Sequence, residues 1–527
     1  MKTLLSFVDL ANIETELLAV VAVDAQTSKE PNAKPELVLL TANEAVKTAA
    51  AAVLANGEYK AGANETLLLH APAGLKAKRL LIVGLGKQAK VTVHSVRSAA
   101  GTAVRFTKPR GIRELVLALP ENDSKILPHT ASVRAAVEGA FVGDFDPDTY
   151  RSDRKDQSVQ SFTLAVAAGA DKADSQTEME TAFAEGVIVG ESQNFTRSLV
   201  NEPGNKLTPT ILGQRAAEMA AQVGLQAEVH STEKLHELKM GAFWSVSQGS
   251  AEPPALIVLR YEPEGVKDGP ELHPTDKDPS AGTPVLGLVG KGITFDTGGI
   301  SIKPSDNMEK MKYDMAGGAA MIGAMRAIAL LKPKVRVIAV VCAAENMPSG
   351  SAQKPGDVQT AMPLSSDKPG KTIEVINTDA EGRMVLADGL TYARQLGATH
   401  LIDAATLTGA CVVALAHVNA GAFSNDDATY AKFDAALAIS GEKFWRLPLG
   451  EEYAELIKSE IGDIKNTGGR YGGACTAAEF LKVFVEDTPW IHLDIAGLAW
   501  VEDSKPYIAK GPSGVAVRSI LEWVRSY

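Results

Sequence analysis

The chain has 527 residues, of which 45% are hydrophobic and 22% charged, proportions typical of a soluble globular protein with two or more domains. Its 53 basic and 64 acidic residues give a net charge of −11, which argues against general attraction to nucleic acid or to an anionic membrane. Three cysteines far apart in the sequence, Cys342, Cys411 and Cys475, exclude a disulfide framework and a CxxC zinc site.

The N-terminal residues superficially resemble a signal peptide. Asp9, Glu14 and Glu16 interrupt the apolar run, so two strands joined by a turn are the better interpretation. An uninterrupted apolar run of the roughly 18 residues that a membrane helix needs is absent from the sequence. We therefore expect a cytoplasmic protein in a reducing compartment, without a membrane partner.

Short apolar runs alternate with helical patterns from residue 17 to residue 167, which predicts an α/β domain. The predicted strands are residues 17–23, 37–40, 79–84, 114–119 and 162–167. The predicted helices are residues 42–55, 91–106 and 132–141. A polar stretch at 143–161 predicts a loop or a domain edge, and a long helix is predicted at 175–199. We expect an N-terminal domain at 1–172, a connecting helix at 173–200 and a C-terminal domain at 201–527.

One strand of the first domain ends in Gly84 and Gly86 with GxGxxA spacing, which resembles a dinucleotide-binding turn. The acidic residue expected after the second strand is not clearly placed, because Pro109 and Gly111 intervene before Glu114. A tight turn is the simpler interpretation. A dinucleotide-dependent oxidoreductase is kept as an alternative.

The C-terminal part again alternates strands and helices, which predicts a second, larger α/β domain around a mixed or parallel sheet. The predicted strands are residues 255–260, 284–289, 335–343, 401–404 and 490–493. The predicted helices are residues 310–331, 389–395 and 476–484. Residues 262–283 are rich in Pro, Gly, Asp and Lys, and predict a solvated insertion.

The stretch from Asn377 to Arg383 reads NTDAEGR. If its backbone is extended, the side chains of Asp379, Glu381 and Arg383 share one face. Two carboxylates beside a guanidinium would suit hard cations or a polarised water. An acidic surface loop with a neutralising arginine is the alternative.

Further carboxylates follow other predicted elements. Asp296 lies in a glycine-rich segment with Lys291, and Asp314 opens an apolar helical run. By itself Lys291 would be a surface lysine, and Asp314 a helix first-turn residue favoured by the dipole. With Asp379 and Glu381, four carboxylates suit two divalent ions about 3.5–4 Å apart. The absence of an HExxH motif excludes zincin chemistry.

Four motifs in chain order carry a resemblance to a known family: VGKGITFDTGG from Val289, DMAGGA from Asp314, NTDAEGRMVLADGL from Asn377 and DAATLTG from Asp403. Lesser matches occur at 199–204, 345–350 and 492–497. The chain resembles the leucyl aminopeptidases (cytosol aminopeptidases, peptidase family M17). The resemblance implies a binuclear metal site on the mixed, helix-flanked sheet of the C-terminal domain.

The resemblance implies the metal ligands. Lys291, Asp296, Asp314 and Glu381 would hold one divalent ion, and Asp296, Asp379 and Glu381 the other. Zinc, manganese and magnesium are the expected ions. A lysine ligates only as the neutral amine, and a neighbouring dication favours loss of its proton.

The resemblance also implies an activity, the hydrolysis of N-terminal peptide bonds with a preference for leucine-like residues. A metal-activated water would attack the carbonyl, Lys303 would stabilise the oxyanion, and Arg383 would hold a bicarbonate ion that relays the proton. The implied pocket for the N-terminal side chain consists of Met311, Thr406, Leu407, Gly409 and Ala496.

The family forms homohexamers, so we expect a homohexamer that acts on peptides with a free N-terminus. Some members also bind DNA, which leaves a second, DNA-binding activity as an alternative. The net charge weighs against it, although residues 108–113 (KPRGIR) form a local basic stretch. Residues 262–283 and 362–370 are longer than is usual in the family and could alter oligomer contacts or access to the site.

Overall fold

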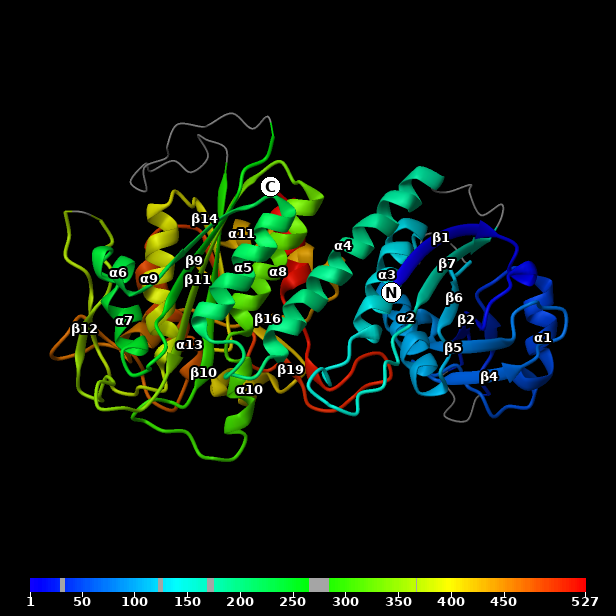
Figure 1. The fold of residues 1–527 in the computed structure, drawn as a ribbon, viewed down its shortest axis with the longest axis horizontal. Helices are drawn as coiled ribbons and strands as arrows, with labels where there is room; N and C mark the ends of the chain where they lie inside the picture. The colour runs from blue at the N-terminus through cyan, green and yellow to red at the C-terminus, as the bar shows by residue number, and fades with distance from the viewer. Residues whose placement is uncertain (29–33, 122–126, 168–174, 265–283, 366) are drawn as a thin grey trace. The chain divides into compact units, whose positions relative to one another are not determined.

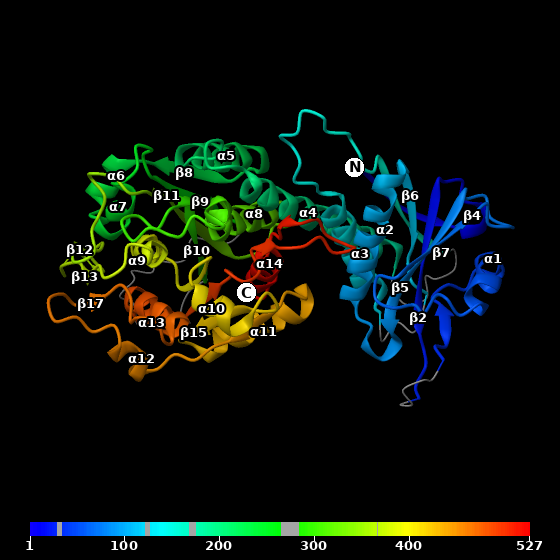
Figure 2. The same cartoon turned by 90° about the horizontal axis from the view of Figure 1, so that it is seen from below.

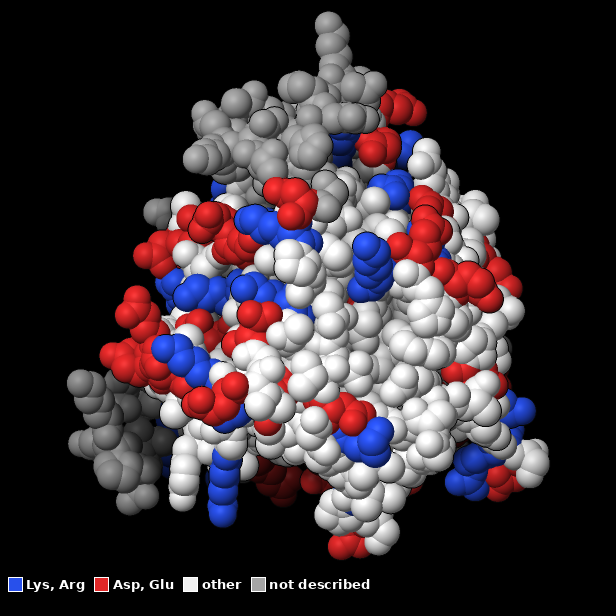
Figure 3. Space-filling view, turned by 90° about the vertical axis from the view of Figure 1, so that its left-hand side faces the viewer, with Lys and Arg blue, Asp and Glu red and all other residues white. Residues whose placement is uncertain are grey.

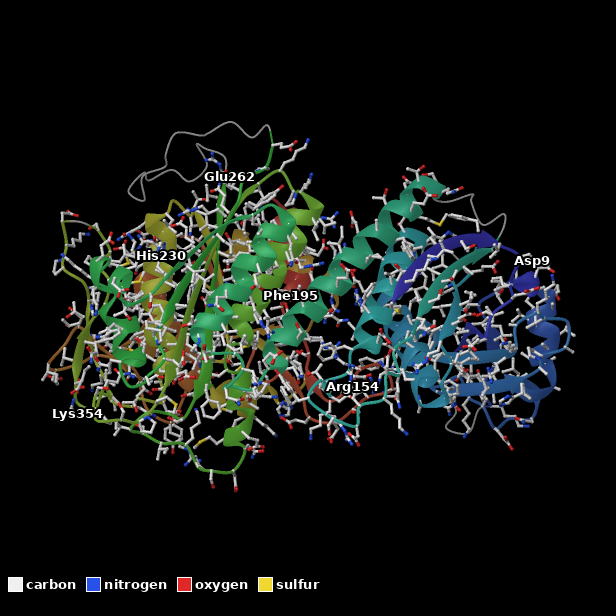
Figure 4. All side chains as sticks on the ribbon, viewed as in Figure 1. Asp9, Arg154, Phe195, His230, Glu262 and Lys354 are labelled. Carbon is white, nitrogen blue, oxygen red and sulfur yellow. The ribbon has the colours of Figure 1, made fainter. Side chains whose placement is uncertain are left out.

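The structure is a computed structural model that describes residues 1–527 except 29–33, 122–126, 168–174, 265–283 and 366. The chain forms two compact units: Met1–Asn194 with Glu502–Gly511, and Phe195–Val501 with Pro512–Tyr527. The division falls within helix α4 (Gln176–Asn201), on which Phe195 is labelled in Figure 4. Most of the predicted insertion at 262–283 lies outside the described residues.

The first unit is built on a seven-stranded sheet, coloured blue to cyan in Figure 1. Its strand order is β1-β7-β6-β2-β5-β4, with β3 paired to β2. Its strands are β1 (Lys2–Val8), β2 (Leu17–Asp24), β3 (Leu37–Leu39), β4 (Thr66–His70), β5 (Arg79–Lys87), β6 (Glu114–Ala118) and β7 (Ser161–Ala167). The antiparallel strand β4 was missing from the prediction. Every residue of β2 is buried, as expected for a central strand covered on both faces.

The helices of the first unit are α1 (Glu44–Ala55), α2 (Val93–Thr107), α3 (His129–Asp144) and the first part of α4. Helices α2 and α3 pack closely, because a Cβ on Gly139 would lie 1.9 Å from the carbonyl oxygen of Arg97. Residues 502–511 join this unit from the far end of the chain. A Cβ on Gly101 would lie 2.8 Å from the carbonyl oxygen of Tyr507 in that segment.

The second unit is built on an eight-stranded mixed sheet in the order β16-β15-β18-β14-β10-β11-β9-β8. Its strands are β8 (Gln226–His230), β9 (Ala255–Tyr261), β10 (Val285–Asp296), β11 (Arg336–Asn346), β14 (His400–Ala405), β15 (Ala420–Ser424), β16 (Phe444–Arg446) and β18 (Trp490–Asp494). The central strands β18, β14, β10 and β11 are parallel. The prediction of two α/β domains, the larger with a mixed sheet, is confirmed.

Helices cover both faces of this sheet, and β10 shows how (Figure 2). Val289 and Gly290 are consecutive and point to opposite faces. A Cβ on Gly389 of helix α9 (Glu381–Gln395) would contact Val289, and a Cβ on Gly290 would lie 2.6 Å from the Cα of Gly318 in helix α8 (Ala316–Leu331). The sheet is therefore the middle layer between α8 and α9.

Two predicted helices differ from the structure. The predicted helix 310–331 is divided into a 3-10 turn, Met308–Tyr313, and α8, so that Asp314 lies before the helix instead of in its first turn. The predicted helix 389–395 is the end of α9, which begins at Glu381. The extended conformation assumed for residues 377–383 is therefore wrong.

Among the described residues one segment, Met308–Leu331, has the length and composition to cross a membrane. Of its most apolar window, 83% is buried inside the protein. Helix α8 packs on β10, β11 and β14, so this segment forms part of the core. Figure 3 shows one face of the molecule, on which acidic and basic side chains are interspersed.

Candidate metal centre

Parallel strands of the second unit bring polar side chains to one edge of the sheet. Asp296 is the last residue of β10, and Asn346 and Asp494 are the last residues of β11 and β18. The carboxyl ends of parallel strands meet at one edge, which is where ligand sites form in open α/β sheets. Ile293 and Phe295 mark a register shift in β10 just before this edge.

Three carboxylates converge at this edge. Asp296, Asp379 and Glu381 each offer one oxygen atom, and these three atoms lie within 4.8 Å of one another. Asp296 and Glu381 are buried, and Asp379 is half-buried. Such a set of oxygen ligands fits divalent cations. The sequence placed these residues in two separate motifs, and the structure brings them together.

Lys291 lies in the interior of this cluster, with 3% of its side chain exposed. Its Nζ donates to Asp314 Oδ1 at 2.9 Å and to the carbonyl oxygen of Thr406 at 2.9 Å, and it lies 2.8 Å from Glu381 Oε1. A Cβ on Gly382 would lie 2.6 Å from Lys291 Cε, so this glycine makes room for the amine. The alternative of a surface lysine is therefore wrong.

Lys303 approaches the cluster from the loop after β10. Its Nζ lies 2.7 Å from Asp296 Oδ2 and also pairs with Asp379. Gly298 shapes this loop, since its φ of 86° is in the left-handed region and a Cβ there would lie 2.9 Å from Asp379 Oδ1. The structure thus places a half-buried ammonium group beside two of the three converging carboxylates.

Burial and mutual charge perturb the titration of these groups. Burial lowers the pKa of Lys291, but the carboxylates of Asp314 and Glu381 outweigh burial, and the pKa is raised. For the carboxyl groups of Asp314 and Glu381, burial acts in the opposite direction and raises the pKa. Burial and the negative charge of Asp296 raise the pKa of Asp379. Perturbed groups gathered in this way are typical of functional sites.

Two buried polar residues that the sequence reasoning missed hold the carboxylates in place. The Asn346 side chain donates to Asp296 Oδ1 at 2.8 Å and to the carbonyl oxygen of Thr378 at 3.0 Å. Thr378 Oγ1 donates to the carbonyl oxygen of Gly298 at 2.6 Å and accepts from the Ser301 amide at 2.8 Å. A small polar residue at a strand end was the signal available in the sequence for Asn346.

Arg383 lies in the first turn of α9, two residues after Glu381. Its Nη1 donates to the carbonyl oxygen of Asn466 at 2.7 Å, while its Nε has no hydrogen-bond partner among the described residues. Burial lowers the pKa of Arg383 to about 10, against the opposing effect of Glu381 and Asp494. Helix α9 also lacks a side-chain cap at Ala380 within the described structure, and the N-terminus of a helix is an electrostatically favourable place for an anion.

Asp494 organises part of the predicted substrate pocket. Its Oδ1 accepts from the amides of Leu407 at 3.2 Å and Ala496 at 3.3 Å, and its Oδ2 accepts from Thr408 Oγ1 at 2.6 Å. Thr406 contacts the cluster of Lys291 and the carboxylates instead, because its Oγ1 donates to Asp314 Oδ1 at 2.7 Å. Two further residues of the predicted pocket are placed separately: Met311 is half-buried in the turn before Asp314, and Gly409 is exposed at the start of α10 (Gly409–Leu415).

The first residues of two sequence motifs meet beneath this edge. The Asp403 carboxylate is 2.6 Å from His492 Nδ1 and accepts from Trp490 Nε1 at 2.6 Å. All three side chains are fully buried. Burial lowers the pKa of His492, but Asp403 outweighs burial, and the pKa is raised. His230, by contrast, lies on the edge strand β8 beside Glu228 (Figure 4).

The glycine turn at Gly84 and the basic stretch 108–113, which could have bound a dinucleotide or DNA, make contacts within the protein. A Cβ on Gly84 would lie 2.1 Å from the carbonyl oxygen of Gly62, so this glycine makes room for neighbouring main chain. In the basic stretch 108–113, Lys108 is buried and lies 2.7 Å from Asp146. These observations do not favour a dinucleotide or DNA ligand.

Comparison with known proteins gives consistent matches. Residues 194–521 match the catalytic domain of the cytosol aminopeptidase family, and residues 20–154 match its N-terminal domain. The probable cytosol aminopeptidase of Acidobacterium capsulatum is 61% identical over 531 residues, covering 100% of both chains. That of Solibacter usitatus is 52% identical, covering 89% of this chain and 92% of the relative.

Solved structures are similar along the whole chain. A mutant of tomato leucine aminopeptidase superposes with a TM-score of 0.83 at 31% identity, covering 100% of this chain and 97% of that one. The bottromycin maturation enzyme BotP in complex with Mn superposes with a TM-score of 0.80 at 32% identity, covering 97% and 99%.

Proposed function

This chain belongs to the cytosol aminopeptidase family, and we propose that it removes leucine-like N-terminal residues. As a metal-dependent aminopeptidase it hydrolyses peptides. The proposed site of the reaction is the cluster of Lys291, Asp296, Asp314, Asp379 and Glu381. The observation that carries this proposal is the convergence of carboxylates from separate segments, with two lysines between them.

The donor set fits two divalent ions. Lys291, Asp296, Asp314 and Glu381 would hold one, and Asp296, Asp379 and Glu381 the other. Zinc, manganese and magnesium suit these ligands, and the similarity to an enzyme in complex with Mn supports manganese. Bound ions would polarise the scissile carbonyl and acidify the attacking water.

The remaining steps fall to side chains of the protein. The Lys303 ammonium group, held by Asp296 and Asp379, would stabilise negative charge that develops on the carbonyl oxygen. Burial lowers the pKa of Lys303, but the carboxylates of Asp296 and Glu381 outweigh burial, and the pKa is raised.

Arg383 would hold a bicarbonate ion, and the chemistry that this ion would supply at the site is a proton relay. Two observations support an anion there: the buried guanidinium and the uncapped N-terminus of α9. The side chain of the substrate's N-terminal residue would lie against Met311, Thr406, Leu407, Gly409 and Ala496.

We also propose that the protein acts in the cytoplasm as a homohexamer. Val413 and Tyr471 of the second unit are 89% and 84% exposed, and association of subunits would give such apolar side chains a partner. Light scattering after size-exclusion chromatography measures the subunit number. A monomer at cellular concentration contradicts this part of the proposal.

The test of the site is Glu381→Ala, with Glu345→Gln as the control. Glu345 is half-buried and accepts from Ser250 Oγ at 2.6 Å, next to Asn346 but outside the cluster. We expect Glu381→Ala to lose nearly all hydrolysis of leucine amide and to bind Mn²⁺ more weakly, while the control retains both. Full hydrolysis by Glu381→Ala after chelation contradicts the proposal.

A further inference from the structure

Asn466 follows the short strand β17 (Ile464–Lys465) and is fully buried. We propose that Asn466 is a positioning residue that holds Arg383 and the turn carrying Asp379 in one fixed arrangement. This inference rests on the proposed function, in which these two residues serve the reaction.

The Asn466 side chain makes hydrogen bonds to the main chain of two consecutive residues, Ile376 and Asn377. Its Oδ1 accepts from the amides of Ile376 at 2.8 Å and Asn377 at 3.3 Å. Its Nδ2 donates to the carbonyl oxygen of Asn377 at 2.7 Å. The two amide donors and one carbonyl acceptor fix which end of the side-chain amide faces which partner. An asparagine matches this pattern, and an alanine would leave these main-chain groups without their side-chain partner.

The bonded segment leads directly to the metal cluster. Asn377 Oδ1 accepts from the Asp379 amide at 2.9 Å, and the Asn377 carbonyl oxygen also accepts from the Ala380 amide at 3.2 Å. Ala380 immediately precedes Glu381 and α9. The position of Asn377, and hence of the turn that presents both carboxylates, depends on the side chain of Asn466.

The main chain of Asn466 serves the second group. Its carbonyl oxygen accepts from Arg383 Nη1, the one hydrogen bond that the described structure gives this guanidinium. Its amide donates to the carbonyl oxygen of Glu374 at 3.0 Å. Because the side chain of Asn466 anchors the residue, loss of the side chain releases the carbonyl oxygen that orients Arg383. One buried residue thus links the carboxylate turn to the guanidinium.

If Asn466 had only a structural role, loss of its side chain would lower Tm and leave kcat unchanged. The chain offers a matched comparison in Asn425, whose Oδ1 accepts from the Trp490 amide at 2.8 Å and whose Nδ2 donates to the carbonyl oxygen of Thr488 at 2.9 Å. Asn425 contacts Trp490, the first residue of β18. The metal cluster lies at the opposite end of the parallel strands. Asn425→Ala therefore reports the loss of similar hydrogen bonds away from the site.

The experiment compares Asn466→Ala, Asn466→Asp and Asn425→Ala in the metal-loaded enzyme, by Tm, kcat, KM and the Kd for Mn²⁺. We expect Asn466→Ala to lower kcat and Mn²⁺ affinity by about 10- to 100-fold, the usual effect of losing a residue that supports metal ligands, with little change in KM. Asn466→Asp keeps both acceptor contacts and recovers part of kcat. Asn425→Ala lowers Tm and leaves kcat and Mn²⁺ affinity unchanged.

A double-mutant cycle tests the link to Arg383. In an Arg383→Ala background, we expect the effect of Asn466→Ala on kcat to shrink, because the group that Asn466 orients is gone. If the kcat loss of the double variant equals the product of the two single losses within about twofold, the two sites are independent and the link is overturned. Asn466 variants that lower Tm while keeping kcat and the Mn²⁺ Kd overturn the inference. Full activity of Arg383→Ala overturns the proposed role of Arg383 instead, and the Mn²⁺ Kd then decides the role of Asn466.

Discussion

Two strands, one in each unit, contain the same local pattern and use it differently. β5 contains Val83-Gly84-Leu85-Gly86-Lys87, and β10 contains Val289-Gly290-Lys291-Gly292. In both, a glycine admits close approach of another backbone. At Gly84 that backbone is the loop at Gly62, and at Gly290 it is Gly318 of α8.

The lysines of these two strands differ in burial and in charge environment. Lys87 has 54% of its side chain exposed and pairs with one carboxylate, Asp24. Lys291 is buried between Asp314 and Glu381, since the close approach at Gly290 brings the start of α8 against β10. A glycine in such a strand therefore provides space, and distant segments decide whether the lysine beside it becomes part of a site.

The largest expected effect comes from removing the buried lysine. Lys291→Met keeps the apolar stem and removes the amine between Asp314 and Glu381. We expect kcat to fall by more than about 100-fold, because the change removes a proposed ligand and not merely a supporting residue. Steady-state hydrolysis of leucine amide and metal content measure it. A fall below tenfold contradicts Lys291 as a ligand.

The glycines offer a matched pair of the same substitution. Gly382→Ala places a Cβ 2.6 Å from Lys291 Cε, so we expect a loss of activity of about 10- to 100-fold. Gly84→Ala places a Cβ 2.1 Å from the Gly62 carbonyl oxygen, so we expect about 1–3 kcal/mol of destabilisation without a change in kcat/KM. Thermal unfolding and kinetics measured together distinguish the two. The comparison fails if Gly84→Ala changes kcat/KM as much as Gly382→Ala.

Metal affinity is expected to depend on pH through Lys291. The surrounding carboxylates raise its pKa, so at neutral pH the amine carries a proton that a bound ion must displace. Affinity therefore falls as pH falls, by up to about tenfold per pH unit for one displaced proton. Calorimetry in buffers of different ionisation enthalpy counts the released protons. An affinity independent of pH contradicts ligation by Lys291.

The smallest effect is expected at the exposed lysine. Lys87→Met removes a partly exposed ion pair, and we expect a loss of at most about 1 kcal/mol in unfolding free energy. Burial raises the pKa of Asp24, but the hydrogen bond from Lys87 and two main-chain amides outweigh burial and hold it lowered. The stabilisation that Asp24 gains from these partners is present above its pKa in the unfolded state. It disappears as the pH falls through the pKa of Asp24 in the folded state. Urea unfolding at neutral and acidic pH measures it, and a loss of activity would contradict the comparison.

The sequence predicted the strands of the parallel cores well, because continuous apolar runs such as 335–343 have few other interpretations. It failed where tertiary contacts decide the backbone. Asp314 lies outside α8, since Lys291 and Thr406 hold its side chain. Residues 377–383 are a turn and a helix start, and Asn466 bonds to the main chain of Asn377 at the beginning of that turn.

The candidate ligands could be named from motifs, and the residues that support them could not. Carboxylates and a lysine are recognisable by type and spacing. Asn346, Thr378 and Asn466 act by hydrogen bonding to main chain that lies far away in the sequence. An isolated asparagine gives no sign of such a partner, since turns and surfaces contain many.

Residues 502–511, which complete the first unit, have a consequence for how the protein is made. Translation produces the first 194 residues long before this segment, whose Tyr507 packs against Gly101. Domains generally fold in the order in which they are synthesised. Here residues 1–194 emerge from the ribosome well before residues 502–511, so the unit acquires the packing contacts of that segment only after about 300 further residues have been synthesised.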